Sequence, residues 1–207
     1  MMHCQRLLGG LMLAAILTLG TAAGAFAQES QDTQDTQASQ ESQESQDSTF
    51  SENEILQKAS GFFGETSEGL AKAIEKVFSD QGRPNAYIAG EEVSGAIGVG
   101  VRYGDGMLRM KTGAGRKVYW QGPSIGFDLG ADASKIFILI YHLPSVDAVF
   151  QRFPAVDGSF YFVAGVGVNY QKSGNIVQAP IRTGVGLRAG VNVGYMHYTR
   201  EKSWIPL

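Results

Sequence analysis

The longest apolar segment outside the N-terminus runs from Val118 to Phe150 and reads VYWQGPSIGFDLGADASKIFILIYHLPSVDAVF. Its pattern indicates a half-buried strand, a glycine-rich turn and a fully buried strand. A proline-initiated turn and a short amphipathic helix over residues 146–153 are expected to follow. The segment also contains Trp120, one of two tryptophans in the chain. We expect the flanking segments to wrap around this stretch and bury it.

The first 27 residues are typical of a secretory signal. Arg6 supplies a positive charge, residues 7–19 are largely apolar, and Ala25-Phe26-Ala27 is a small-x-small cleavage site. Cleavage is therefore expected between Ala27 and Gln28. A transmembrane anchor is the alternative, but the apolar run is shorter than the roughly 20 residues that span a bilayer.

Export without an anchor predicts a soluble periplasmic protein. Cys4 is the only cysteine and lies within the expected signal, so the processed chain should have no thiol and no disulfide. An outer-membrane barrel is the alternative. Strands of such barrels are roughly ten residues long, and the expected strands at 107–111 and 176–178 are too short.

Residues 28–53 are expected to be a disordered linker, and residues 54–207 a single β-barrel domain. The linker consists almost entirely of Gln, Ser, Thr, Asp and Glu, and this composition buries too little apolar surface to offset the entropy of ordering. Its charges are all negative, whereas the domain has only a small excess of Lys and Arg. The lack of a strongly basic region argues against nucleic-acid binding.

Two amphipathic helices are expected between residues 50 and 80. Ser51 and Glu54 have the spacing of a capping box, and a second helix should begin near Thr66 or Ser67. The second helix carries an apolar stripe at helical spacing, formed by Leu70, Ala71, Ile74, Val77 and Phe78. The stripe either packs on a sheet or barrel or lies on a membrane surface.

From Tyr87 onward the apolar residues alternate, which is typical of strands. Residues 103–107 (YGDGM) predict a tight hairpin turn. The expected strands are 96–103, 107–111, 116–120, 124–130, 135–142, 160–170, 176–178 and 182–198. Glycines on one face of several strands indicate tight curvature, with a large side chain such as Trp120 lying across them.

A meander of this length should close, because open sheet edges invite aggregation. The predicted fold class is therefore mainly β. We expect a small soluble antiparallel β-barrel of about eight strands, with N-terminal helices and one short late helix.

The sequence contains no catalytic constellation. The glycine-rich runs lie inside strands and lack the Lys-Ser/Thr of a phosphate loop, and His142 and His197 have no second ligand at metal spacing. No catalytic residue, metal or cofactor is therefore predicted. A cryptic hydrolase using Asp128, Asp132 or His142 is the enzymatic alternative. The candidate contacts for a ligand or partner are Leu70, Ile74, Phe78, Trp120, Tyr141 and His142.

Several motifs resemble the family of domain of unknown function 1134. They are 61–64 (GFFG) with 69–71 (GLA), 82–92 (GRPNAYIAGEE), 118–128 (VYWQGPSIGFD), 143–148 (LPSVDA) and 193–195 (VGY). The resemblance covers residues 54–207. It implies a soluble periplasmic protein with a small eight-stranded barrel and no known catalytic residues. It also implies a role in envelope integrity and stress resistance, connected with lipopolysaccharide O-polysaccharide.

A weaker similarity is to the SYLF (Ysc84-type) lipid-binding domains. It rests on the outline from 120–126 (WQGPSIG) to 146–148 (VDA), although the dense basic cluster of such domains is not obvious here. The sequence thus favours a non-enzymatic periplasmic protein that binds an unidentified protein, glycan or lipid of the envelope. A lipid-binding module, with the helical stripe or the Trp120 region meeting acyl chains, is the alternative. The sequence does not predict an oligomeric state.

Overall fold

The computed structural model describes residues 48–64, 67–128, 133–183 and 194–203, with the backbone alone at 95–99, 124–128 and 133. The expected signal peptide, its cleavage site at Ala27 and Gln28, and linker residues 28–47 lie outside these ranges. Residues Gln43–Leu207 form one compact unit. None of the helices in the described ranges is long and apolar enough to cross a membrane.

Among the described residues, two helices precede the sheet: α2 (Glu52–Phe63) and α3 (Glu68–Gln81). The capping box at the start of α2 is confirmed. The Ser51 amide donates to Glu54 Oε2 at 2.7 Å, and the Glu54 amide donates to Ser51 Oγ at 3.3 Å. Ser67 caps α3 by accepting a hydrogen bond from the Leu70 amide at 3.1 Å. Of the two positions at which this helix was expected to begin, the structure therefore has Ser67.

The folded region begins before residue 54, so the linker boundary expected at residue 53 is too late. Phe50 is 5% exposed, and its ring meets the edge of the Tyr87 ring with centroids 5.4 Å apart. The Phe50 amide also donates to the Pro84 carbonyl at 2.8 Å. Burial of this one aromatic residue, which follows a polar run, anchors the chain directly in front of α2.

Replacing Ser51 with alanine is expected to lower the free energy of unfolding by about 1 kcal/mol, because the first turn of α2 loses its cap. Chemical denaturation measures this loss. Ser79→Ala is the matched control, since Ser79 is an exposed serine inside α3 and alanine is the better helix former there. Equal stability of the two variants would contradict a capping role for Ser51.

In the part of the chain that the structure describes, nine strands form one antiparallel sheet in the order β4-β9-β2-β1-β3-β8-β6-β5, and β7 also pairs with β8. The strands are β1 (Ala86–Met110), β2 (Gly115–Asp128), β3 (Ala133–Tyr141), β4 (Arg152–Pro154), β5 (Tyr161–Val163), β6 (Val166–Val168), β7 (Gln171–Ser173), β8 (Ile176–Thr183) and β9 (Tyr195–Thr199).

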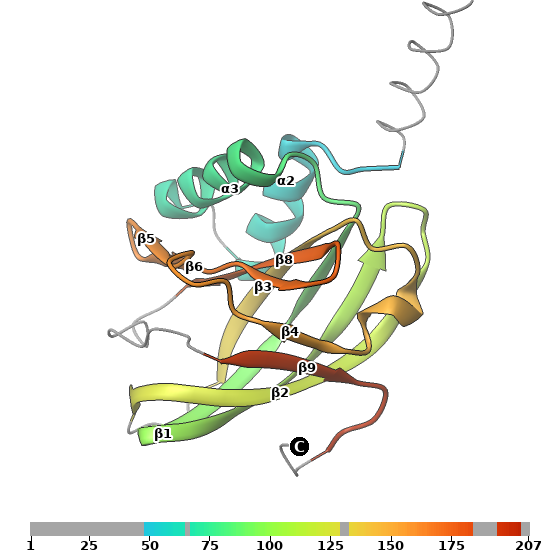
Figure 1. The fold of residues 1–207 in the computed structure, drawn as a ribbon. Coiled ribbons are helices and arrows are strands. Elements are labelled where there is room, and N and C mark those ends of the chain that lie inside the picture. Colours follow the sequence, from blue (N-terminus) through green and yellow to red (C-terminus); the bar gives the residue numbers. More distant parts are fainter. Residues whose placement is uncertain (1–47, 65–66, 129–132, 184–193, 204–207) are drawn as a thin grey trace, which may run out of the picture. The chain divides into compact units, whose positions relative to one another are not determined.

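The sheet curls into a half-barrel, with α2 and α3 on one side of it (Figure 1). The curl brings β4 back to β7, where an isolated bridge joins Ala155 to Gln171. The mainly β, barrel-like prediction is confirmed, with nine strands where about eight were expected.

The hairpin turn predicted at residues 103–107 is wrong, because β1 continues through it. The β1–β2 register runs without a break from Ala96 opposite Asp128 to Arg109 opposite Gly115, and the chain reverses at the following turn, where Gly113 has a φ of 92°. The two short strands expected around Gly104 are therefore one. Likewise, the strands expected at 116–120 and 124–130 are one strand, β2.

The strand predicted over residues 160–170 is a short hairpin, β5–β6. Ala164 and Gly165 have φ values of 44° and 87° and form its turn, since two consecutive left-handed residues reverse an antiparallel pair. The helix expected over residues 146–153 is one turn of 3₁₀ helix, η1 (Val146–Val149). The strand expected at 176–178 extends to Thr183. Most of the segment 182–198 lies outside the described residues.

The central strand β3 is buried on both faces, as its continuous apolar run predicts. Ile136, Ile138 and Ile140 belong to a core cluster inside the curl that includes Trp120. The alternate side chains, of Phe137, Leu139 and Tyr141, belong to a second cluster under α2 and α3. The sheet therefore has two different buried faces, called here the inner face and the helix-covered face.

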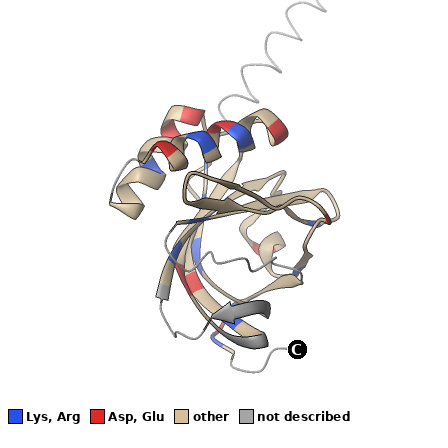
Figure 2. Cartoon of the chain, turned by 90° about the vertical axis from the view of Figure 1, so that its left-hand side faces the viewer, with Lys and Arg blue, Asp and Glu red and all other residues tan. Residues whose placement is uncertain are grey.

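The apolar stripe of α3 packs on the helix-covered face. Leu70, Ile74 and Val77 are at most 1% exposed, and burying each such side chain contributes roughly 1.5–3 kcal/mol. The opposite side of the helices carries interspersed acidic and basic residues (Figure 2), including the i,i+4 ion pair of Lys72 with Glu68. The packing interpretation of the stripe is confirmed, and the membrane-surface interpretation of the same residues is wrong.

Candidate functional site

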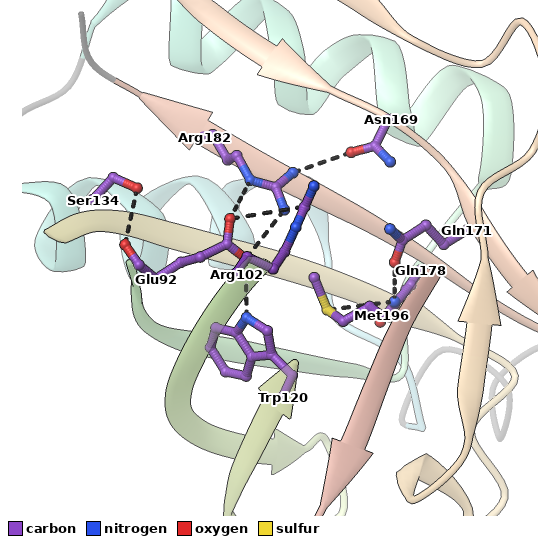
Figure 3. Close-up of polar contacts among 9 residues, drawn as sticks. All are labelled: Glu92, Arg102, Trp120, Ser134, Asn169, Gln171, Gln178, Arg182 and Met196. Carbon is purple, nitrogen blue, oxygen red and sulfur yellow. Dashed lines mark hydrogen bonds and ion pairs between the residues drawn. The ribbon is translucent and has the colours of Figure 1, made fainter. Parts of the chain in front are cut away.

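Charged and amide side chains gather on the inner face, where the curl of the sheet encloses them (Figure 3). We call this group the polar cluster. Its members are all buried, and they are Glu92 and Arg102 of β1, Trp120 of β2, Asn169 after β6, Gln171 of β7, Gln178 and Arg182 of β8, and Tyr198 of β9. The inner face is therefore polar at its centre, although apolar side chains surround it.

The phase of each strand places these side chains inward. In β1, Glu92 follows the inward Ile88 by four residues, and Arg102 precedes the inward Leu108 by six. In β8, Arg182 follows Ile176 by six. Because alternate residues of a strand share a face, even separations leave all three charges inside the curl.

Glu92 is the centre of the cluster. Its Oε1 accepts a hydrogen bond from Arg182 Nε at 3.1 Å and lies 3.9 Å from Arg102 Nη1. Its Oε2 accepts from Arg182 Nη2 at 3.4 Å and from Trp120 Nε1 at 3.0 Å. One carboxylate thus joins β1, β2 and β8.

The surroundings of Glu92 keep it ionised. Burial acts to raise the pKa of its carboxyl group, but the charges of Arg182 and Arg102 and the hydrogen bonds from Arg182 and Trp120 outweigh burial, so the pKa is lowered. Burial is also the main reason that the pKa of Arg102 falls to about 10, with the charge of Glu92 opposing the fall. At neutral pH Glu92 and Arg102 are therefore both charged.

Amide side chains of the polar cluster form two separate hydrogen-bonded groups, of which the first contacts the ionic centre. Arg182 Nη1 donates to Asn169 Oδ1 at 3.1 Å. In the second group, Tyr198 OH donates to Gln178 Oε1 at 2.7 Å, and Gln178 Nε2 donates to Gln171 Oε1. Asn169 Nδ2 is buried and has no hydrogen-bond partner among the described residues.

Trp120 is held against glycines. A Cβ atom added to Gly104 would overlap the six-membered ring of the indole, and one added to Gly90 would lie 2.8 Å from Trp120 Cη2. On the side of β9 the indole packs on Tyr198 with ring centroids 6.0 Å apart. Trp120 does lie against strand glycines, but Gly90 and Gly104 are not the glycines from which that expectation was drawn. Gly104, which was expected to form a turn, is one of these glycines.

The structure does not bring the six predicted contact residues together. Trp120 belongs to the polar cluster, whereas Leu70, Ile74 and Tyr141 are buried under the helices at 1% exposure each. Phe78 is half-buried against the same core. Buried side chains of this kind stabilise the fold and do not reach a ligand, so these contact predictions are corrected.

The remaining candidates are scattered. His142 is exposed and adopts a left-handed backbone conformation with a φ of 57° after β3. The side chain of Asp128 and all of Asp132 lie outside the described residues, so the proposed grouping with His142 stays a prediction. Among the described residues, no group of three His, Cys, Asp or Glu side chains is placed to hold a metal ion.

Glu92, Arg102 and Arg182 were not predicted from the sequence. The signal that could have found them is their position in phase with inward apolar residues, where a charge is rarely buried unless it is paired. A single charged residue in phase with inward apolar residues does not identify a site. A carboxylate and two guanidinium groups in phase on different strands indicate an internal ionic cluster.

The chain was compared with known proteins. A family model described as Envelope integrity protein A matches residues 48–207. This chain belongs to the envelope integrity protein A family. The resemblance to the family of domain of unknown function 1134, whose best-known member is an envelope integrity protein, is thereby confirmed. Family membership connects the chain with the integrity of the cell envelope.

A solved structure agrees with this family assignment and with the fold. It is described as a beta-barrel-like, uncharacterized protein from Brucella abortus, with 44% sequence identity and a TM-score of 0.71. The match covers 77% of this chain and 99% of that one. A search of curated proteins found no match.

Proposed function

We propose that this chain is a non-enzymatic periplasmic protein that supports envelope integrity by binding an envelope component at the inner face of its sheet. The observation that carries the proposal is the row Phe162–Gly167–Arg182, in which each residue is directly opposite the next on β5, β6 and β8. Directly opposed residues share a face, so Phe162 and Arg182 lie on the same side of the sheet.

This row joins the buried interior to the surface. Arg182 is 7% exposed, whereas Phe162 at the sheet edge is 56% exposed. Gly167 stands between them and has no side chain. An exposed aromatic residue beside buried hydrogen-bonding groups is the arrangement of a site that holds an amphipathic partner, because the aromatic ring binds apolar surface and the polar groups fix orientation.

The ionisation of Glu92 supports a binding role over a catalytic one. A general acid or base works best with a pKa near the operating pH, and the arginines hold the pKa of Glu92 below its ordinary value. Glu92 therefore serves as the counter-ion of Arg102 and Arg182. The periplasmic location rests on the signal-like residues 1–27.

A lipid is the second candidate partner, and the same row is its point of contact. Helix α3 cannot serve, since Leu70 and Ile74 are buried against the sheet. The exposed Phe162 gives an acyl chain an apolar contact on the inner face. Native mass spectrometry of the chain purified from its own host, with lipid extraction, distinguishes a bound lipid from a bound glycan or protein.

Replacing Phe162 with serine is expected to cost the host at least tenfold in survival under envelope stress, such as detergent, because the partner loses its apolar contact. The measurement is survival of a deletion strain carrying each variant, with protein levels and periplasmic fractionation checked alongside. Met107→Ser is the control: Met107 is 38% exposed and points outward, one residue from the inward Leu108. Parental survival with F162S would refute the proposed binding face.

A further inference from the structure

We infer that Arg116 and Arg200 form a second binding site, which takes a phosphate or carboxylate group at the surface of the protein. Arg116 lies near the start of β2, and Arg200 directly follows β9. Their side chains are 45% and 55% exposed, so a ligand can reach both. Other strands form this site than the row from Phe162 to Arg182, and the inference therefore goes beyond the proposed function.

The pairing of β2 with β9 brings the two arginines together. Tyr119 is directly opposite Thr199 in this pair, and one step further along the same register Arg200 comes beside Val118. Arg116 precedes Val118 by two residues, and residues two apart in a strand share a face. Like charges at such neighbouring positions repel each other. A negative group is therefore expected at the point where the two guanidinium groups meet.

Asp147 of η1 supplies that negative group. Arg116 Nη1 donates to Asp147 Oδ1 at 3.2 Å, and Arg200 Nη2 donates to the same oxygen at 3.0 Å. The side chain of Asp147 is itself 62% exposed, and exposed ion pairs of this kind contribute little to stability. Their main effect is to fix where the two guanidinium groups lie.

The ring of Phe150 supports both guanidinium groups. The Cζ atom of Arg200 lies 4.5 Å from the ring centroid, and that of Arg116 lies 5.4 Å from it. Phe150 is half-buried and packs on the core inside the curl, so it is a firm support. Side chains that are already held in place lose less conformational entropy when they bind a ligand. The two arginines are therefore preorganised.

The remaining donors define what kind of group binds. A guanidinium group has several N–H donors and no acceptor, and Asp147 uses one donor of each arginine. Among the described residues, neither arginine donates to another side chain. Phosphate and carboxylate groups offer two or more charged acceptor oxygens, which match the planar fork of a guanidinium group. A neutral hydroxyl offers two cations one acceptor atom and no charge.

Arg116→Gln and Arg200→Gln test the site in the full chain. Each removes one charge and one fork. Arg109→Gln is the matched control, because Arg109 is an exposed arginine of β1 that points outward, one residue from the inward Leu108. Arg116→Lys keeps the charge but loses the fork. All these residues are exposed, so each variant should fold, and circular dichroism with thermal unfolding shows whether it does.

Inorganic phosphate and acetate are titrated into isotope-labelled protein at constant ionic strength, and the Nε–H resonances of the arginines are followed by NMR. We expect the resonances of Arg116 and Arg200 to shift saturably with at least one of the two anions. R116Q and R200Q should bind about tenfold more weakly, as expected for lost hydrogen bonds to a charged group. R109Q should bind like the parent, and R116K should lie between R116Q and the parent.

Cosedimentation with phosphatidylglycerol vesicles, with phosphatidylcholine vesicles as the neutral reference, distinguishes the sources of the anionic group. Retention on phosphatidylglycerol that is lost in R116Q identifies a lipid headgroup. Binding of a free anion without such retention identifies a soluble or glycan-borne group. Both results support the site, because both require the Arg116 fork.

The inference is overturned if none of the three anionic probes binds. It is also overturned if R109Q weakens binding as much as R116Q, or if R116K binds like the parent, since charge alone would then explain binding. The proposed function fails on a different result, normal survival of the F162S strain under envelope stress. Phe162 takes no part in the Arg116–Arg200 site, so the two failures are distinguishable.

Discussion

Replacing Glu92 with glutamine should lower the free energy of unfolding by about 3–5 kcal/mol, the usual cost of removing one partner of a buried ion pair. The glutamine keeps the shape of the side chain but not its charge. Arg102 and Arg182 then remain inside the curl without the carboxylate that both approach at 3.9 and 3.1 Å. The indole of Trp120 also loses a charged acceptor. Denaturant-induced unfolding measures the loss.

Glu91→Gln is the control for this prediction. Glu91 precedes Glu92 in β1, is exposed, and projects from the other face of the sheet, so the same change of charge there should alter stability by less than about 0.5 kcal/mol. If E92Q and E91Q lose the same small amount, the polar cluster does not hold the strands together as described.

The stabilisation by Glu92 should also depend on pH. Its pKa is lower in the folded protein than in an unfolded chain, so the stabilisation is fully present above the unfolded pKa. It is lost as the pH falls through the folded pKa. The difference in stability between the parent and E92Q should accordingly shrink as the pH is lowered below the ordinary range for a glutamate.

Replacing Trp120 with alanine should cost about 3–5 kcal/mol of unfolding free energy, because a large buried aromatic leaves a cavity. The indole is 2% exposed and packs on Tyr198 and Gly104. The same change removes the hydrogen bond from Trp120 Nε1 to Glu92, which is 3.0 Å long. Thermal or denaturant unfolding measures the loss, and Trp120→Phe should retain part of the stability.

A double-mutant cycle with Gly104→Ala tests whether the packing is as described. Alone, the added methyl group should destabilise by about 1–3 kcal/mol through overpacking, since it would overlap the indole ring. In the Trp120→Ala background the ring is absent, so the same methyl group should be nearly neutral. Additive losses in the double variant would show that Gly104 does not accommodate Trp120.

Local chemistry made the ends of the helices and the central strand predictable. The Ser51–Glu54 spacing specifies a cap from neighbouring residues alone, and the apolar run of β3 specifies burial on both faces. The interpretations of Gly104 and Gly165 were both wrong, because Gly104 was assigned to a turn and Gly165 to the interior of a strand. Gly104 lies inside a strand because a distant indole needs the space, whereas Gly165 forms a turn with a φ of 87°. The sequence shows that glycine is required but not whether space or backbone conformation requires it.

The candidate site was less predictable than the fold for a related reason. Trp120 was noticed because it is rare and lies in an apolar segment. Glu92 and Arg182 are 90 residues apart in the chain, and only the pairing of β1, β3 and β8 brings them within hydrogen-bonding distance. Phase along a strand predicts which face a side chain occupies, but not which partner it meets there.

The long pairing of β1 with β2 has a consequence for how the protein matures. These strands are joined by a short turn and meet along the register from Ala96 to Arg109, so their association is local and can form early. Arg182 arrives only with β8, whose pairing with β3 closes a much longer loop. Nascent chains that stall at the hairpin thus contain Glu92, Arg102 and Trp120 but no assembled cluster. The binding face that we propose is therefore completed only with the whole fold, and a partner that required it would distinguish finished molecules from unfinished ones.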